Sequence, residues 1–263
     1  MTPARASLVA GLLHPGEMGA AVGRCLVARG LIVLWASQDR SPATAARARA
    51  AGLTDAGTPA AVAGQADVIF SICPPHAAAD LAAGVSGFSG LYVDANAISP
   101  QTAREVAGIV EAGGARYIDG GIIGPPPGAP GSTRLYLSGS AADQVGRLFD
   151  GTMLDAHILA AGPFSASAIK MAYAAWTKGS AALLLAARAL ADATDVAEVL
   201  LAEWALSQPG LDDRFHLAAS AAAAKGWRWI AEMEQIADTM ASAGLPVGFH
   251  RAAAEMFRRG QVT

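Results

Sequence analysis

Several features that mark other classes of protein are scarce in this sequence of 263 residues. Only two cysteines are present, Cys25 and Cys73, and they lack the C-x-x-C spacing of a zinc or redox site. The hydrophobic runs stay shorter than the roughly 18 to 20 residues that a membrane-spanning helix needs. The histidines are scattered without a metal-ligand motif, so no metal is predicted. The two separate thiols favour a reducing, cytoplasmic setting.

Charge of either sign is also sparse. The chain has 19 basic and 22 acidic residues, a formal charge of −3, and no basic block. A small-molecule substrate is therefore expected, rather than a nucleic acid or a membrane surface. Residues 1–13 are mostly apolar, as in a secretory signal, but His14-Pro15-Gly16 stands where such a signal has a small-residue cleavage site. A first buried strand is favoured there instead.

The pattern of short β-rich runs and Ala-rich runs predicts the organisation of the chain. The alternation in the first part is typical of βαβ units that form a parallel sheet. Strands are expected at residues 7–13, 31–36, 67–73, 91–94, 116–119, 134–138 and 154–159, with helices such as 19–29 and 42–51 between them. From residue 165 onwards the spacing is helical, which predicts helices at 165–193, 196–207, 211–243 (with some interruption) and 247–259.

These elements predict two domains in an α/β protein. A Rossmann domain with a doubly wound, mostly parallel sheet is expected over residues 1–161, and an all-helical domain over 162–263. The boundary falls where Gly162 and Pro163 interrupt the chain. The helical part has few polar residues and runs of alanine, so it is expected to bury apolar surface in a homodimer.

The turn after the first strand resembles a dinucleotide-binding fingerprint. In G-x-G-x-x-G the glycines allow a tight turn, close approach of a pyrophosphate, and packing of helix on strand. His14 stands in the first place, and Gly16 and Gly19 hold the second and third. Glu17 and Met18 open the following helix, whose N–H groups can bind an anion. The alternative is an ordinary glycine-rich turn.

The end of the second strand indicates which nucleotide is bound. NAD-binding domains place a carboxylate there, to bond the adenosine ribose. Here Ser37 occupies that position, and Arg40 with Ser41 could bind a 2′-phosphate through charge-assisted hydrogen bonds. NADP is therefore favoured over NAD, with Asp39 as the opposing observation. The alternative is a solvated turn that caps the helix starting at Pro42.

Five segments resemble the β-hydroxyacid dehydrogenase and 6-phosphogluconate dehydrogenase superfamily. They are the dinucleotide loop, the turn after the fourth strand, a short Asp-Ala-Asn run, a glycine-rich segment, and a run ending in Lys-Met: residues 14–19, 71–75, 94–96, 119–125 and 162–171. The resemblance covers nearly the whole chain. It implies NAD(P)-dependent oxidoreductase activity, a Rossmann domain and a helical C-terminal domain.

The resemblance also implies roles for individual residues. Lys170 matches the catalytic lysine, and Asn96 belongs to the segment that reaches the nicotinamide and the substrate. The turn along the cofactor and the segment for the substrate carboxylate comprise Cys73, Pro74, Pro75, His76, Gly120, Gly121 and Ile122. Gly120 and Gly121 are expected to form a turn whose N–H groups approach a carboxylate or carbonyl oxygen, although a plain turn would use the same residues. Asn96 has a second interpretation, an Asx turn that caps the helix near Ser99.

Some positions depart from the family pattern. Ala174 stands where the family commonly has Asn, and Ala231 where a second lysine is expected. Ile122-Ile123 replaces more polar residues. These departures set the chain apart from enzymes of 6-phosphogluconate or 3-hydroxyisobutyrate and resemble a branch with a short helical C-terminal domain.

The candidate reaction is hydride transfer between NADP(H) and a small hydroxy acid or the corresponding aldehyde or ketone. A desolvated lysine can exchange a proton near neutral pH, which suits Lys170, although a lysine that reaches the helix end would look the same. Tyr173 could donate the proton instead, or be a core residue. Lys178 and Trp227 are expected to contact substrate, with a solvated lysine and a core aromatic as alternatives. Reduction of C=N bonds and non-catalytic nucleotide binding are the alternative functions.

Overall fold

The computed structural model describes residues 8–260, so Ser7, the first residue of the earliest predicted strand, lies outside the described residues. The chain divides into two compact units, unit 1 (Met1–Lys170) and unit 2 (Met171–Thr263). The long helix α7 (Ser165–Ala193) begins in unit 1 and continues in unit 2. The division therefore falls inside this helix, whereas the sequence pattern placed it just before the helix, after residue 161.

Unit 1 is built on one sheet of eight strands in the order β3-β2-β1-β4-β5-β6-β7-β8. The strands are β1 (Val9–Leu12), β2 (Ile32–Trp35), β3 (Thr54–Asp55), β4 (Val68–Ser71), β5 (Leu91–Asp94), β6 (Arg116–Ile123), β7 (Thr133–Ser138) and β8 (Leu154–Ile158). All neighbours are parallel except β6 and β7, which are antiparallel. The predicted mostly parallel, Rossmann-like sheet is confirmed.

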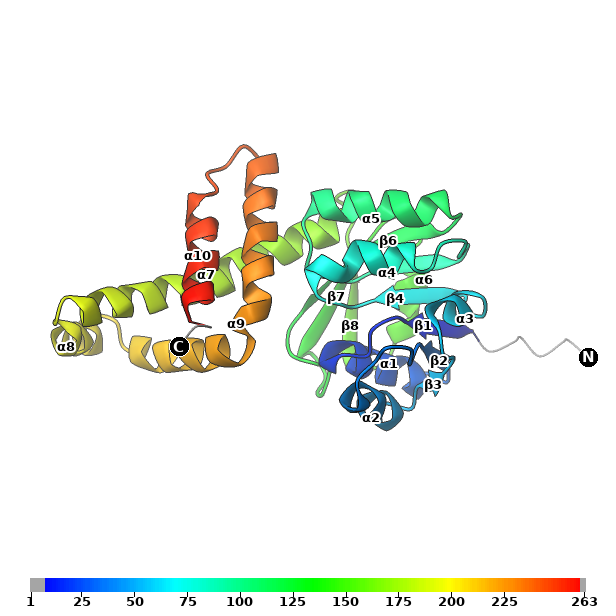
Figure 1. The fold of residues 1–263 in the computed structure, drawn as a ribbon, viewed down its shortest axis with the longest axis horizontal. Coiled ribbons are helices and arrows are strands. Elements are labelled where there is room, and N and C mark those ends of the chain that lie inside the picture. The colour runs from blue at the N-terminus through cyan, green and yellow to red at the C-terminus, as the bar shows by residue number, and fades with distance from the viewer. Residues whose placement is uncertain (1–7, 261–263) are drawn as a thin grey trace, which may run out of the picture. The chain divides into compact units, whose positions relative to one another are not determined.

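Helices cover both faces of this sheet (Figure 1). They are α1 (Glu17–Ala28), α2 (Pro42–Ala50), α3 (Pro59–Ala63), α4 (Ala78–Ala83), α5 (Pro100–Ala112) and α6 (Ala142–Gly146), with short 3-10 turns η1 (Pro75–Ala77) and η2 (Arg147–Phe149). Successive strand residues point to opposite faces, so Phe70 packs in the core with α1 and Ile69 in the core with α4 and α5. Both faces are apolar, as expected of a buried parallel sheet.

Two strands differ from the sequence prediction. Strand β3 was missed because it has only two residues, both exposed, and no apolar pattern. Strand β6 was expected to end at Asp119 with a turn at Gly120-Gly121, and this was wrong. The strand continues to Ile123 because β7 pairs with it from Asp119↔Ser138 to Ile123↔Arg134. A remote partner thus carries the strand through residues that locally favour a turn.

Unit 2 contains helices only. They are most of α7, and then α8 (Ala197–Ser207), α9 (Leu211–Ser242) and α10 (Gly248–Arg259). Helices α9 and α10 pack together, with the Trp229 and Phe257 ring centroids 5.1 Å apart. The interruption expected in the third helix is absent, since α9 is continuous. Within residues 8–260, no helix combines the length and hydrophobicity needed to cross a membrane.

Candidate functional site

Four buried polar side chains form a row across the carboxyl edge of the sheet in unit 1. Ser71 of β4 is in register with Asp94 of β5, Asp94 with Asp119 of β6, and Asp119 with Ser138 of β7. All four residues are at most 1% exposed. Buried polar groups require partners, so this row must be bonded to the segments that follow the strands. Open α/β sheets bind ligands at this edge.

Asp119 and Ser138 cap the first turn of helix α7. The Ser167 backbone N–H donates to Asp119 Oδ2 at 2.8 Å, and the Ser167 hydroxyl donates to Asp119 Oδ1. Ser138 Oγ donates to Asp119 Oδ2 at 3.0 Å and accepts from the Ala166 N–H at 3.2 Å. The first N–H groups of a helix have no partner within the helix, and a carboxylate there also interacts favourably with the helix dipole. The sheet edge therefore fixes where α7 begins.

Lys170 lies one turn into the same helix. Its side chain is half-buried, and Nζ donates to the Ile122 carbonyl oxygen at 2.7 Å. Ile122 itself contributes its side chain to the hydrophobic core, so only its backbone faces the lysine. The structure thus brings together two of the residues predicted for the site, through a contact that the sequence did not indicate.

Gly120 and Gly121 serve the packing of the helix on the strand. They were expected to form a turn that presents N–H groups to a substrate, but both lie inside β6. A Cβ at Gly121 would lie 2.5 Å from the Ala166 carbonyl oxygen and 3.1 Å from Lys170 Cβ. Any other residue at this position would push the start of α7, and with it Lys170, away from the sheet.

Asn96 ties two loops together at the other end of the row. Its Oδ1 accepts from the Cys73 N–H at 2.6 Å, and its Nδ2 donates to Ser71 Oγ at 3.0 Å. Its own N–H donates to Asp94 Oδ1 at 3.0 Å. The alternative of a helix cap at Asn96 is wrong, since Ser99 caps α5 by accepting from the Thr102 N–H.

Burial controls the ionisation of the row. Burial raises the pKa of Asp94 to about 7, against the hydrogen bond from the Asn96 N–H, and the nearby Asp119 charge raises it further. Burial also raises the pKa of Asp119 to about 6, with the Ser167 and Ser138 hydrogen bonds opposing it. Burial raises the pKa of the Cys73 thiol to about 12. Cys73 is therefore a neutral thiol at physiological pH. The carboxyls of Asp94 and Asp119 have pKa values close to that pH.

The predicted dinucleotide loop joins β1 to α1 as expected. A Cβ at Gly19 would lie 2.4 Å from the His14 carbonyl oxygen, so only glycine lets the helix approach the turn. Gly16 is the N-cap residue of α1 and offers no side-chain cap, which leaves the first-turn N–H groups to another acceptor. These features fit a bound pyrophosphate.

Arg40 lies against this loop. Its Nη1 is 3.1 Å from His14 Nδ1, and its Nη2 donates to the Leu13 carbonyl oxygen at 3.3 Å. Because a guanidinium only donates, Nδ1 is the acceptor, and a neutral His14 ring carries its proton on Nε2. The arginine predicted to recognise the 2′-phosphate thus also supports the histidine that replaces the first glycine.

An acid that the sequence pattern did not indicate lies beside Ser37. Asp55, at the end of β3, is in register with Trp35, and hydrogen bonds from Gly57 and Ser37 lower its pKa. A carboxylate therefore lies beside Ser37 after all, supplied by a neighbouring strand. Ser41 caps α2 by accepting from the Thr44 N–H at 3.2 Å, as in the alternative interpretation of this turn.

The remaining turn residues lie after β4. Pro74 precedes η1, Pro75 and His76 lie within it, and His76 is exposed. In the described part of the chain, no group of three or more His, Cys, Asp or Glu side chains is arranged to hold a metal ion.

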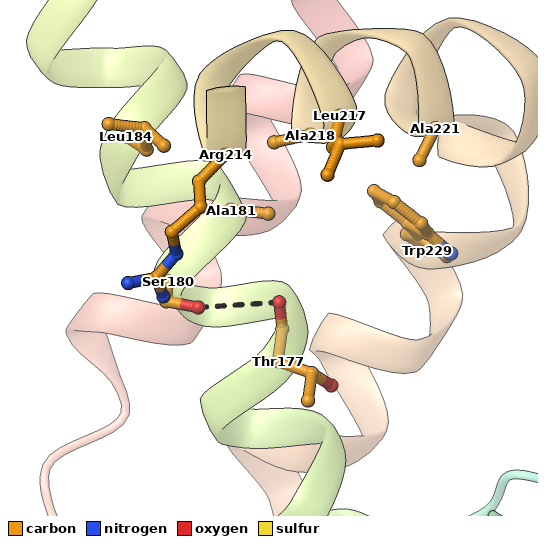
Figure 2. A pocket seen from close by; sticks show the side chains of 9 residues that line it. All are labelled: Thr177, Ser180, Ala181, Leu184, Arg214, Leu217, Ala218, Ala221 and Trp229. Atoms are coloured by element: carbon orange, nitrogen blue, oxygen red, sulfur yellow. Dashed lines mark hydrogen bonds between the residues drawn. The ribbon is translucent and has the colours of Figure 1, made fainter. Parts of the chain in front are cut away.

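Unit 2 contains the other predicted site residues. Lys178 of α7 forms an ion pair with Glu232 of α9, and both side chains are mostly buried. Tyr173 and Trp227 are 45% and 54% exposed, so neither is a core residue of the single chain. A pocket of about 300 Å³ lies between α7 and α9, and Figure 2 shows the Arg214 side chain beside Ser180 on one side of it and Trp229 on the other.

Comparison with known families agrees with this architecture. Residues 10–150, more than half of the chain, match the NAD-binding domain of 6-phosphogluconate dehydrogenase. The chain belongs to this family. The superfamily predicted from the five segments is thereby confirmed. Residues 191–260 match a second model, described as a domain of unknown function (DUF1932). A search of curated proteins gives no match.

Solved structures share the fold over nearly the whole length. A conserved protein of unknown function, described as structurally similar to 3-hydroxyacid dehydrogenases, is 27% identical, covers 97% of each chain and gives a TM-score of 0.71. A 3-hydroxyisobutyrate dehydrogenase from Salmonella typhimurium is 20% identical over 96% of this chain and 94% of that one, with a TM-score of 0.72. A reductive aminase from Aspergillus terreus, solved with NADPH4, cyclohexanone and allyl amine, is 21% identical over 97% and 95%, with a TM-score of 0.60. At such low identity the last two show the fold alone.

Proposed function

We propose that the protein transfers a hydride between NADP(H) and a small hydroxy acid, or the corresponding aldehyde or ketone. Lys170 exchanges the accompanying proton with the substrate oxygen. The observation that carries this proposal is the attachment of Lys170, whose Nζ is held 2.7 Å from the Ile122 carbonyl oxygen at the carboxyl edge of the sheet. Positioned proton transfer of this kind accelerates a reaction by about 10² to 10⁴.

The dinucleotide loop supplies the nucleotide site. The first-turn N–H groups of α1, at Glu17 and Met18, bind the pyrophosphate, and Gly16 allows its approach. His14 Nε2 donates a hydrogen bond to the cofactor phosphate, and the turn from Cys73 to His76 lies along the cofactor. When bound, the nicotinamide donates or accepts the hydride.

Lys170 is suited to proton exchange by its surroundings. The Ile122 carbonyl oxygen accepts a hydrogen bond from Nζ and holds the half-buried side chain at the carboxyl edge of the sheet, the edge at which open α/β sheets bind their ligands. Contacts of Tyr173, Lys178 and Trp227 with the substrate stay predictions.

Reduction of a C=N bond is the second candidate. Ala174 stands where the family commonly has Asn, so this buried position carries no polar side chain for a substrate hydroxyl. A substrate panel should therefore contain cyclic imines as well as hydroxy acids, aldehydes and ketones. A chain that binds NADPH but turns over no member of the panel would instead be a nucleotide-binding protein without catalysis.

Replacement of Lys170 tests the proposal. We expect Lys170→Met to lower the turnover number by about 10² to 10⁴ because a thioether cannot transfer a proton. NADPH affinity, measured by fluorescence titration, should hardly change. Lys170→Arg is the matched control, since it keeps the charge but does not release a proton. Turnover close to wild type in Lys170→Met would refute the role of Lys170.

Replacement of Arg40 tests the preference for NADP. Arg40→Ala should lower the NADPH affinity relative to the NADH affinity by about tenfold or more, because only NADPH has a 2′-phosphate for the guanidinium. Asp55→Asn is the matched variant and should change the ratio in the opposite direction, because it removes a negative charge beside Ser37. Equal losses for both nucleotides in Arg40→Ala would assign Arg40 to support of the His14 loop alone.

A further inference from the structure

Strand β6 and helix α7 are joined at two points of equal sequence separation. Asp119 accepts from the Ser167 N–H, and the Ile122 carbonyl accepts from Lys170 Nζ; each pair is 48 residues apart in the chain. Residues 119–122 therefore run alongside residues 167–170 in a fixed register. Gly121, which has no side chain, lies between the two attachment points and admits the helix backbone.

The Asp119 attachment is the stronger of the two. Its carboxylate is fully buried and accepts from the Ser167 N–H, the Ser167 hydroxyl and the Ser138 hydroxyl. Hydrogen bonds to a charged acceptor in a buried setting are among the strongest in proteins. Lys170 follows Ser167 by three residues, less than one helical turn. Movement of the capped turn would therefore move the lysine.

We propose that Asp119 is a positioning residue that holds the ammonium of Lys170 on the Ile122 carbonyl by fixing the first turn of α7. This inference rests on the proposed role of Lys170 in proton transfer. Asp119 itself faces away from solvent and does not exchange the proton. If Asp119 only stabilised the fold, its replacement would lower the free energy of unfolding and leave the reactivity of Lys170 in the folded protein unchanged.

The lysine content of the chain makes a direct test possible. The sequence contains only three lysines, Lys170, Lys178 and Lys225. The folded full-length protein is treated with a dilute amine-acylating reagent, and the rate at each lysine is followed by peptide mass spectrometry. Lys225 serves as the internal reference. This measurement needs no substrate.

We expect Asp119→Ala to raise the acylation rate of Lys170 by about tenfold relative to Lys225, because the amine loses its fixed hydrogen bond. Asp119→Asn keeps an acceptor for the Ser167 N–H and should restore most of the protection. Asp94→Ala is the matched control: it removes the neighbouring buried carboxylate, which accepts from the Asn96 N–H rather than from α7. It should leave the Lys170 rate unchanged.

An unchanged Lys170 rate in a folded Asp119→Ala protein would overturn the proposal, as would an equal increase in Asp94→Ala. If Asp119→Ala does not fold, the double variant Ser138→Ala/Ser167→Ala removes both hydroxyl donors to Asp119 and the acceptor of the Ala166 N–H, and a Lys170 rate equal to wild type in that variant would overturn the proposal too. The proposed function fails separately, through full turnover of Lys170→Met. With a substrate from the panel, Asp119→Ala should lower kcat while the NADPH affinity stays constant, and Asp119→Asn should recover most of the loss.

Discussion

Large apolar side chains on the central strands of unit 1, such as Phe70 and Tyr92, are fully buried, whereas Leu206, Val199 and Trp176 of unit 2 are 81%, 71% and 69% exposed. The difference follows from architecture. A parallel sheet covered on both faces encloses its own core, while the long helix α7 is apolar on more than one side and is left partly exposed by α8, α9 and α10. Leu217 adds to this surface, because it is 71% exposed and lines the pocket between α7 and α9.

The comparison also concerns polar groups. Unit 1 encloses a row of buried hydroxyls and carboxyls that determines where α7 starts, and unit 2 encloses the Lys178–Glu232 ion pair. Each buried polar group constrains a helix position, because a shift would leave it without a partner. The buried polar contacts that fix the proposed site are thus in unit 1, and the exposed apolar surface is in unit 2.

The largest effect should come from the exposed surface of unit 2. We propose that it is buried in a homodimer, so light scattering at micromolar concentration should give twice the chain mass. Trp176 and Leu183 lie two turns apart on α7, and changing both to Glu should raise the dissociation constant by more than about 10². Ile109→Glu in unit 1 is the control, with a side chain 37% exposed in α5, and it should leave the mass unchanged. A wild-type monomer would show that unit 2 tolerates its apolar surface in water.

A smaller effect is expected from the tight contact in unit 1. Gly121→Ala places a Cβ 2.5 Å from the Ala166 carbonyl oxygen and should lower the free energy of unfolding by about 1 to 3 kcal/mol in urea denaturation. Gly108→Ala is the matched control because nothing lies within 4 Å of its Cβ. In the middle of α5 it should stabilise the protein by about 0.5 to 1 kcal/mol. Equal effects of the two substitutions would contradict the close approach of β6 and α7.

The smallest effect concerns the buried row. The folded pKa of Asp94, about 7, is above its ordinary value of 3.8, so between these pH values the folded state holds more of this proton than the unfolded state. Its contribution to the free energy of unfolding therefore falls as pH rises from about 4 to 7. Asp94→Asn keeps an acceptor for the Asn96 N–H and removes this titration. The unfolding temperature of Asp94→Asn minus that of the wild type should be more positive at pH 8 than at pH 5.

Asp55→Asn provides the matched control. The pKa of Asp55 is lowered in the folded state, so its stabilising contribution is present above its unfolded pKa and is lost only in acid. Removing it should therefore lower the unfolding temperature about equally at pH 5 and pH 8, and by less in acid. If both variants respond to pH in the same way, the burial of Asp94 does not control its ionisation.

Local sequence determined the elements and their order. Short β-rich runs predicted seven of the strands, and the helical spacing from 165 to 193, with Gly179 as its one glycine, predicted α7. The spacing of Gly16 and Gly19 after β1 predicted the dinucleotide loop, because close packing of the first helix on the turn requires glycine at a fixed offset. Each of these features depends on residues within a few positions of one another.

Tertiary structure decided the remainder. Strand β6 passes through Gly120 and Gly121 because β7 pairs with it, and β3 brings Asp55 to Ser37 from a two-residue strand without a pattern. The bond from Ser167 to Asp119 and that from Lys170 to Ile122 each span 48 residues. No periodicity encodes such a distance. The sequence identified the lysine as a candidate, but its hydrogen-bond partner and the carboxylate that caps its helix arise only when a strand and a remote helix pack in one register.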